Sequence, residues 1–146
     1  MELAFFADPL GEFKLEKDST FAMMAEAAKR GHRIVAFGQG DFALDRDEVT
    51  VRASHIELTG KEDASWFRVL ETRNRRLESF DAVIVRKDPP FDVEDVNSTY
   101  FLELAETKGA KVFNRPEAIR SHNEKLTIAQ FPEFIVPTLV TSDENR

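Results

Sequence analysis

The stretch from residue 81 to residue 92, DAVIVRKDPPFD, limits the fold more than any other part of the chain. Residues 82–85 are apolar and mostly β-branched, which is typical of a strand buried on both faces of a sheet. Pro89 and Pro90 fix φ and remove two backbone donors, so neither a strand nor a helix continues through them. The sequence therefore predicts a buried strand that ends in a stiff turn. Charged residues lie between the two parts: Arg86, Lys87 and Asp88.

The first 37 residues predict a strand, a helix and a second strand. Residues 3–7 and 33–37 are short apolar runs. Between them, apolar residues recur at helical spacing: Phe21, Met24, Ala25 and Ala28. Asp18, Ser19 or Thr20 is placed to cap this helix, and Gly31 to close it. Such a unit is almost always right-handed with parallel strands.

The middle of the chain is less regular. Residues 42–44, 49–51 and 55–58 read as short strands, with a turn at residues 45–48, and they predict an antiparallel excursion. The run from Trp66 to Leu70 fits a helix or a strand, because its periodicity does not decide between them.

Further elements are predicted after the proline turn. Asp92 is placed to cap a helix, whose apolar face holds Val93, Val96, Tyr100, Phe101 and Leu104. Then follow a strand at residues 111–114, a helix from Pro116, a helix capped by Asn123, and a strand at residues 137–141. The fold class expected is α/β: a Rossmann-like open, mainly parallel sheet flanked by helices, with an antiparallel excursion in the middle.

In an open α/β sheet, ligands bind outside the carboxyl ends of the strands. Three loops are expected there, at residues 8–20, 86–92 and 114–125. Their charges are of both signs, which suits an amino acid or a peptide better than a polyanion. The same mixture is also what an ordinary solvated surface carries.

Composition and spacing argue against several classes of function. A net charge of −7 disfavours nucleic acid and anionic membranes as partners. No apolar run approaches the roughly 20 residues that span a bilayer, and the first residues do not resemble a signal peptide. The absence of cysteine fits a reducing compartment, so a cytoplasmic location is expected. His32, His55 and His122 are scattered, so no metal site is predicted.

Residues 38–43 match the dinucleotide pattern G-x-G-x-x-A. The pattern requires a helix that opens at its last position, and residues 44–48 look like a turn instead. A bend with two glycines is therefore favoured over a nucleotide site.

Several stretches together resemble the N-terminal half of prokaryotic glutathione synthetases. They are Asp8-Pro9 after the first strand, KDSTFAM at 17–23, RKDPPFD at 86–92, Thr99-Tyr100, VFNRPEAIR at 112–120, NEKL at 123–126 and PTLVT at 137–141. Their order and spacing match along essentially the whole chain, whereas residues 41–77 match only loosely.

The resemblance implies an ATP-dependent ligase of the ATP-grasp type, which joins γ-glutamylcysteine to glycine through an acyl phosphate. Residues 1–121 would be a pre-ATP-grasp substrate domain, and 122–146 the start of an ATP-grasp domain whose remainder this chain lacks. That remainder would bind most of the ATP and Mg²⁺, so the chain alone is expected to be inactive and to bind no cofactor. The family also suggests a homo-oligomer. Substrate binding is expected at Asp18, Ser19, Arg86, Lys87 and Asp88, and ATP binding at Lys125.

Other readings remain open from the sequence. In one alternative, the cations pair with the absent domain as interface salt bridges. The chain is alternatively a free-standing, non-catalytic module for binding or oligomerisation, since a fold does not fix a function. It is also compatible with the front half of a different ATP-grasp ligase.

Overall fold

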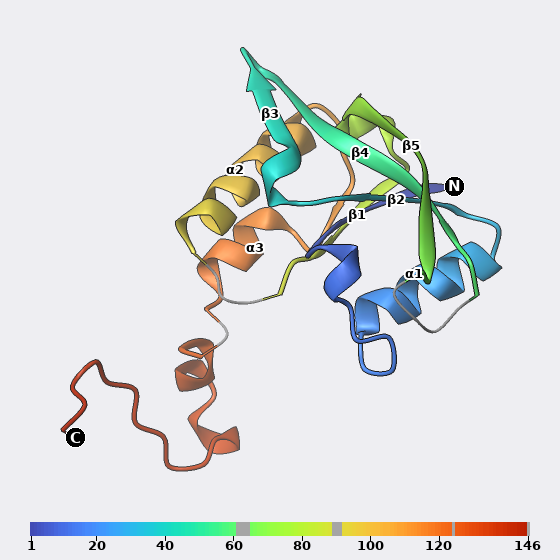
Figure 1. Cartoon of the computed structure of the whole chain (residues 1–146). Coiled ribbons are helices and arrows are strands. Elements are labelled where there is room, and N and C mark those ends of the chain that lie inside the picture. The colour runs from blue at the N-terminus through green and yellow to red at the C-terminus, as the bar shows by residue number, and fades with distance from the viewer. Residues whose placement is uncertain (61–64, 89–91, 124, 146) are drawn as a thin grey trace.

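A computed structural model describes residues 1–60, 65–88, 92–123 and 125–145 of the chain. Seven strands form one curved sheet, and helices lie on both of its faces (Figure 1). The parallel part of the sheet consists of β1 (Glu2–Ala7), β2 (Arg33–Phe37), β6 (Ala82–Arg86) and β7 (Val112–Phe113). The antiparallel part consists of β3 (Phe42–Asp45), β4 (Glu48–Leu58) and β5 (Phe67–Arg76). The predicted fold class, with its antiparallel excursion, is confirmed.

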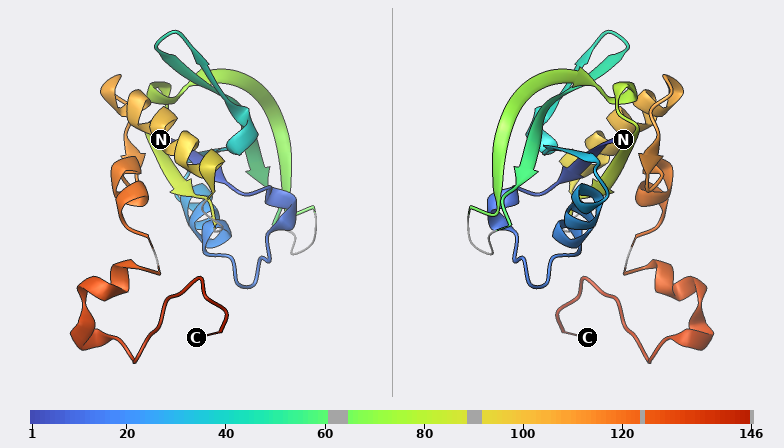
Figure 2. Two further views of the ribbon diagram at one scale, coloured as in Figure 1. Left: turned by 90° about the vertical axis from the view of Figure 1, so that its left-hand side faces the viewer. Right: turned by 90° about the vertical axis from the view of Figure 1, so that its right-hand side faces the viewer.

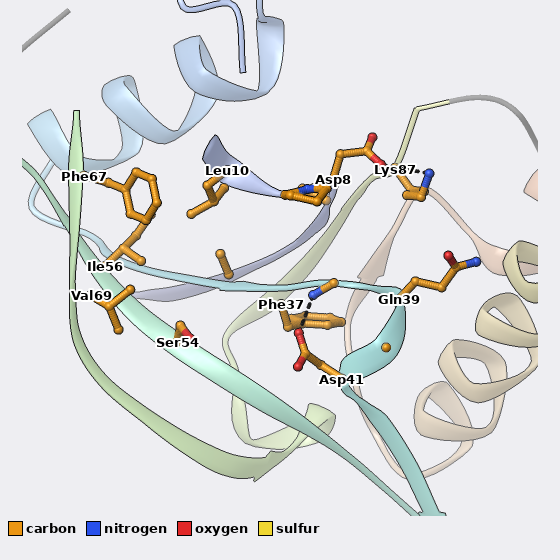
Figure 3. A pocket seen from close by; sticks show the side chains of 15 residues that line it. Asp8, Leu10, Phe37, Gln39, Asp41, Ser54, Ile56, Phe67, Val69 and Lys87 are labelled. Carbon is orange, nitrogen blue, oxygen red and sulfur yellow. Dashed lines mark hydrogen bonds and ion pairs between the residues drawn. The ribbon is translucent and has the colours of Figure 1, made fainter. Parts of the chain in front are cut away.

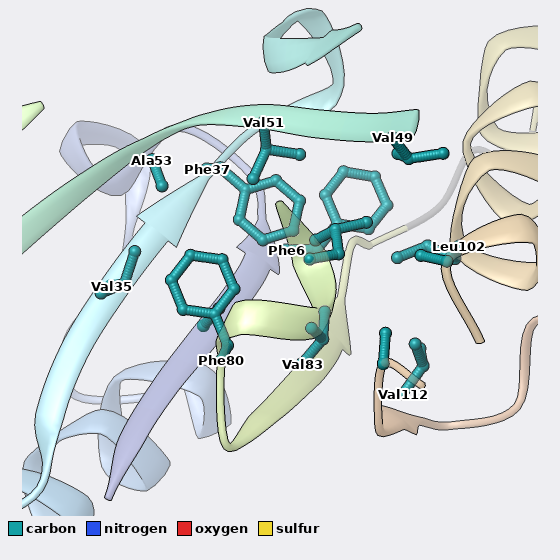
Figure 4. Close-up of a cluster of buried hydrophobic side chains, with 14 residues drawn as sticks. Phe6, Val35, Phe37, Val49, Val51, Ala53, Phe80, Val83, Leu102 and Val112 are labelled. Atoms are coloured by element: carbon teal, nitrogen blue, oxygen red, sulfur yellow. The ribbon is translucent and has the colours of Figure 1, made fainter. Parts of the chain in front are cut away.

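The strand order is β3-β4-β2-β1-β6-β7, and β5 pairs with β4. The central strand β1 is apolar from Leu3 to Ala7, as expected for a strand that is covered on both faces. Phe5 packs on one face against Met24 and Ala27 of α1 (Ser19–Lys29). Phe6 packs on the other face, in the cluster that contains Leu102 and Ala105 of α2 (Val93–Thr107) (Figure 4). Helices on opposite faces leave the carboxyl edge of β1 open between them.

Both long helices begin where the sequence predicts. Asp18 caps α1, and its carboxylate accepts hydrogen bonds from the backbone N–H groups of Thr20 and Phe21. Asp92 caps α2 in the same way, within a capping box completed by Asp95. Gly31 follows α1 with a φ of +78°, a value that favours glycine. Helix α3 (Pro116–Ser121) starts with proline in its first turn.

The hairpin of β4 and β5 differs from the prediction. Residues 49–51 and 55–58 belong to one strand of 11 residues rather than two short ones. The undecided run after Trp66 is a strand, β5, because it pairs along nearly the whole of β4. Pairing between distant residues settles what local periodicity leaves open.

A β-bulge divides β5 into two halves. Ile56 pairs with Val69, whereas His55 pairs with Glu71, so Leu70 has no opposite residue in β4. An extra residue exchanges the faces to which the following side chains point. Phe67 and Val69 of the first half therefore face the side of the sheet that α1 covers, whereas Glu71 of the second half faces the opposite side.

The segment after α3 contains two short 3-10 helices, Thr127–Gln130 and Pro132–Phe134. The α-helix expected after Asn123 is therefore wrong over its described residues, although the Asn123 side chain does accept from the backbone N–H groups of Lys125 and Leu126. The strand expected at residues 137–141 is also wrong. These residues form no strand and pair with none of the described strands. The segment lies away from the sheet in every view (Figures 1 and 2). Its apolar side chains are exposed: Leu126, Phe131, Phe134, Val136, Leu139 and Val140.

Candidate functional site

The loops that follow β1 and β6 meet at the carboxyl edge of the sheet. Their strands are neighbours and parallel, and the chain leaves them toward helices on opposite faces. This is the switch point at which open α/β sheets bind ligands. Lys87 Nζ lies 2.8 Å from a carboxylate oxygen of Asp8, and the backbone N–H of Asp88 donates to the other oxygen at 2.9 Å. Asp88 thus contributes its backbone to this contact.

Arg86 points toward the first turn of α1. Its guanidinium donates to the hydroxyl of Ser19 at 2.6 Å and to that of Thr20 at 3.2 Å. Within the described part of the chain, no carboxylate lies within ion-pair distance of Arg86. The guanidinium is held by hydroxyl groups, so no ion pair with a described residue neutralises its charge. The arrangement is suited to an anionic group of a ligand.

The carboxylate of Asp18 is already engaged as the cap of α1, so its measurable role is structural. We expect Asp18→Ala to lower the free energy of unfolding by about 1 kcal/mol, because two backbone N–H groups lose their acceptor. Urea denaturation of the two proteins measures the difference. Asp45→Ala, on the exposed end of β3, is the control. Equal stability of the wild type and Asp18→Ala would contradict this role.

The glycine-containing bend after β2 is a 3-10 turn, Gln39–Asp41, that leads directly into β3. No helix opens there, so the nucleotide fingerprint lacks the helix N-terminus that it requires. Asp41 closes the bend by accepting from the backbone N–H of Gly38. The side-chain amide of Gln39 donates to the buried carboxylate of Asp95 at 3.1 Å. The bend therefore links the carboxyl edge of β2 to the start of α2.

A groove of about 580 Å³ runs along this edge of the sheet (Figure 3). Asp8, Gln39, Asp41 and Lys87 lie at one end of it. Apolar side chains line the other end: Leu10, Ile56, Phe67 and Val69. The size and the mixture of apolar walls with a few polar groups are those of sites for small ligands.

Trp66 holds one wall of the groove in place. The indole is buried and donates a hydrogen bond from Nε1 to the carbonyl oxygen of Leu10 at 3.2 Å. Its ring stacks on Phe13, with centroids 5.7 Å apart, and meets Phe21 edge-on. The aromatic cluster thereby joins the β4–β5 hairpin to the loop between β1 and α1.

The Asp8–Lys87 contact raises the pKa of Lys87 above its ordinary value of 10.5. The hydrogen bond to Asp8 is the main cause, the charges of Asp8, Asp95 and Asp92 add to it, and burial opposes it. A raised pKa means that the folded state favours the charged amine. The stabilisation is therefore complete below pH 10.5 and is lost as the pH rises through the higher pKa of the folded state.

This linkage predicts a pH-dependent difference between the wild type and Lys87→Met. The free energy of unfolding should differ between them at neutral pH, and the difference should shrink above pH 10.5. Urea denaturation at several pH values measures it. A difference that stays constant through this range would show that the charge of Lys87 contributes nothing to stability.

The third loop predicted at the ligand site, residues 114–125 after β7, is held against α2 instead. Arg120 donates to Thr99 of α2 at 3.1 Å, pairs with Glu103 and lies over the ring of Tyr100. These contacts fasten α3 to α2. Lys125 follows α3 in the segment that lies away from the sheet. Two parts of the prediction lie outside the described residues. They are Pro89 and Pro90 of the turn, and Glu124 of the NEKL motif.

Sequence reasoning missed Asp8 and Gln39. The sequence places Asp8 only in a loop after the first strand, and Gln39 only in a bend with two glycines. Asp8 contacts Lys87 and Gln39 contacts Asp95. These partners lie far away in the sequence, so no local pattern predicts either contact.

Neither a cluster of metal ligands nor a membrane-spanning helix is found among the described residues. No group of three or more histidine or acidic side chains is placed to hold a metal ion within this part of the chain. Over the same residues, no helix is both long and apolar enough to cross a lipid bilayer.

Comparison with known proteins gives a consistent result. The family model described as prokaryotic glutathione synthetase, N-terminal domain, matches residues 1–120. The chain is 53% identical over its whole length to the glutathione synthetase of Ralstonia nicotianae, covering 45% of that protein. It is 48% identical to that of Nitrosomonas europaea and 47% identical to that of Neisseria meningitidis serogroup B, covering 46% of each. The chain thus spans about half the length of these curated relatives. It belongs to the family of prokaryotic glutathione synthetase N-terminal domains.

Proposed function

We propose that the chain is the N-terminal, substrate-binding part of a glutathione synthetase. In the reaction proposed for the complete enzyme, the γ-phosphoryl group of ATP passes to the cysteine carboxylate of γ-glutamylcysteine, which gives an acyl phosphate and ADP. The amine of glycine then attacks the acyl carbon, the new amide bond forms and phosphate leaves. The environment of Arg86 is the observation that supports a substrate-binding role. Arg86 lies at the switch point and has no carboxylate partner among the described residues.

The remaining residues have supporting roles in this proposal. Ser19 and Thr20 hold the guanidinium of Arg86 beside the N-terminus of α1, and Asp18 fixes the helix turn that carries them. Lys87 contributes a second cation, positioned by Asp8. A preorganised cation such as Arg86 stabilises developing negative charge most strongly where water is excluded.

We further propose that residues 1–121 form the substrate domain and 122–146 the start of an ATP-grasp domain. In this proposal ATP supplies the phosphoryl group, and Mg²⁺ neutralises the negative charge of the phosphates. Lys125 is proposed to contact the phosphates, and carboxylates in the rest of the protein to hold the metal. The exposed apolar side chains between Leu126 and Val140 support a contact with such a domain, because burying them against it would remove apolar area from water. The complete protein is proposed to be a cytoplasmic homo-oligomer, and the 146 residues alone to be inactive.

The direct test is to express the gene with the reading frame that follows the codon for Arg146, and to purify the product. Incubation with ATP, Mg²⁺, glycine and γ-glutamylcysteine should release phosphate and form the tripeptide. Omission of any one substrate should abolish both signals. A purified full-length protein that binds γ-glutamylcysteine but forms no tripeptide would overturn the ligase assignment. The 146-residue chain serves as the inactive comparison.

A further inference from the structure

The groove at the carboxyl edge of the sheet has two chemically different ends (Figure 3). Asp8 and Lys87 lie at the charged end, and the apolar end is lined by β4, β5 and the loop that contains Leu10. A ligand that fills it carries charges at one end and hydrocarbon next to them.

The charged end presents one negative and one positive group side by side. Asp8 and Lys87 are 2.8 Å apart, and their side chains are 28% and 20% exposed, so both remain accessible. The backbone of Asp88 holds both groups: its N–H donates to Asp8, and its carbonyl oxygen accepts from Lys87 at 3.0 Å. The backbone of Asp88 therefore fixes the pair, while both charged groups remain accessible to a ligand.

Two opposite charges at this spacing match the head of an α-amino acid, whose ammonium and carboxylate groups sit on one carbon atom. The ligand's carboxylate would accept from Lys87 Nζ, and its ammonium would donate to Asp8. The four charges then alternate in sign, and none is left unmatched. Charge-assisted hydrogen bonds of this kind are among the strongest in proteins.

Two substrates of the proposed reaction carry an amino group. The glycine amine is the nucleophile and must be free to attack, so an ion pair with Asp8 would hinder it. In γ-glutamylcysteine the γ linkage leaves the α-amino and α-carboxylate groups of glutamate unused. They are remote from the reacting cysteine carboxylate, and binding energy from such remote groups is available to orient the substrate.

We propose that Asp8 and Lys87 bind the free α-amino acid head of the γ-glutamyl residue, and that the groove beside them receives its two methylene groups. This inference rests on the proposed function, and it adds that the protein selects γ-linked over α-linked peptides through this pair. An α-linked glutamyl residue has no free α-carboxylate and presents only the ammonium.

The test compares two acceptors in the full-length protein: γ-glutamylcysteine and glutarylcysteine, which is the same molecule without the α-amino group. We expect Asp8→Asn to raise the KM for γ-glutamylcysteine about 10- to 100-fold. The same substitution should leave the KM for glutarylcysteine, glycine and ATP nearly unchanged, because the lost contact is absent with glutarylcysteine.

Lys87→Met provides the complementary measurement, with 4-aminobutyrylcysteine, which lacks the α-carboxylate. This variant should discriminate poorly between 4-aminobutyrylcysteine and γ-glutamylcysteine, whereas the wild type should prefer the latter. Asp47→Asn is the matched control, since Asp47 pairs with Lys108 on the exposed surface away from the groove. It should match the wild type with every acceptor.

The outcomes separate the two proposals. If the protein makes glutathione but Asp8→Asn raises the KM equally for γ-glutamylcysteine and glutarylcysteine, Asp8 only maintains the loop and the head-group assignment is overturned. If the wild-type protein forms tripeptide from none of the acceptors, the proposed function itself has failed.

Discussion

Replacing Arg86 with alanine in the full-length protein should lower kcat/KM for γ-glutamylcysteine about 10- to 150-fold. This range corresponds to the loss of one hydrogen bond between charged groups, about 1.5–3 kcal/mol. The guanidinium has hydroxyl partners but no carboxylate partner among the described residues, so a ligand anion would meet its full charge. Steady-state kinetics with saturating glycine and ATP measure the effect.

Two further variants make this measurement specific. Arg86→Lys should recover only part of the loss, because an ammonium group cannot reproduce the planar fork of donors. Arg30→Ala, which removes an exposed cation at the opposite end of α1, should have no effect. An unchanged kcat/KM in Arg86→Ala would show that Arg86 is not a substrate anchor.

The second large effect is expected on stability. Trp66→Ala should lower the free energy of unfolding of the 146-residue chain by about 3–5 kcal/mol, the usual cost of truncating a buried aromatic residue. Because single domains are stable by only about 5–15 kcal/mol, this is a large fraction of the total. Trp66 is buried against Phe13 and Phe21, so the variant loses packing on several sides. Urea denaturation followed by circular dichroism measures it.

Trp66→Phe distinguishes packing from hydrogen bonding. It keeps an aromatic ring but loses the hydrogen bond to Leu10, so a cost of only about 1 kcal/mol is expected. Phe134→Ala, at an exposed position after α3, should change stability little. If Trp66→Ala were as stable as Phe134→Ala, the aromatic cluster would not hold the loop between β1 and α1.

The elements that the sequence predicted correctly are those specified locally. Asp18 and Asp92 cap helices through N–H groups two or three residues away, so residue type and position were sufficient. The strand Ala82–Arg86 follows from the uninterrupted apolar run at residues 82–85, although only Ala82 and Val83 are fully buried. In the candidate site, the same local reasoning found Arg86 and Lys87, because a charged pair directly after such a strand must lie at the edge of the sheet.

The errors and omissions concern partners that lie far away in the chain. β4 and β5 are long because they pair with each other, and neither is strongly apolar by itself. The apolar run at residues 137–141 has the composition of a strand but no neighbouring strand among the described residues, and a strand needs one to satisfy its backbone groups. Asp8 is recognised as part of the site only when its distance to Lys87 is known.

The bulge at Leu70 has a consequence for how this strand tolerates change in length. Phe67 and Val69 reach the groove, while Glu71 and Arg75 reach the opposite face, because Leu70 lies between Val69 and Glu71 without a partner in β4. Deleting Leu70 would make Val69 and Glu71 consecutive and leave them opposite Ile56 and His55, so regular alternation would keep every remaining side chain on its present face. Conservative substitution of Leu70, whose side chain is half exposed, leaves that arrangement intact. The position is therefore permissive both for the identity of the residue and for its loss.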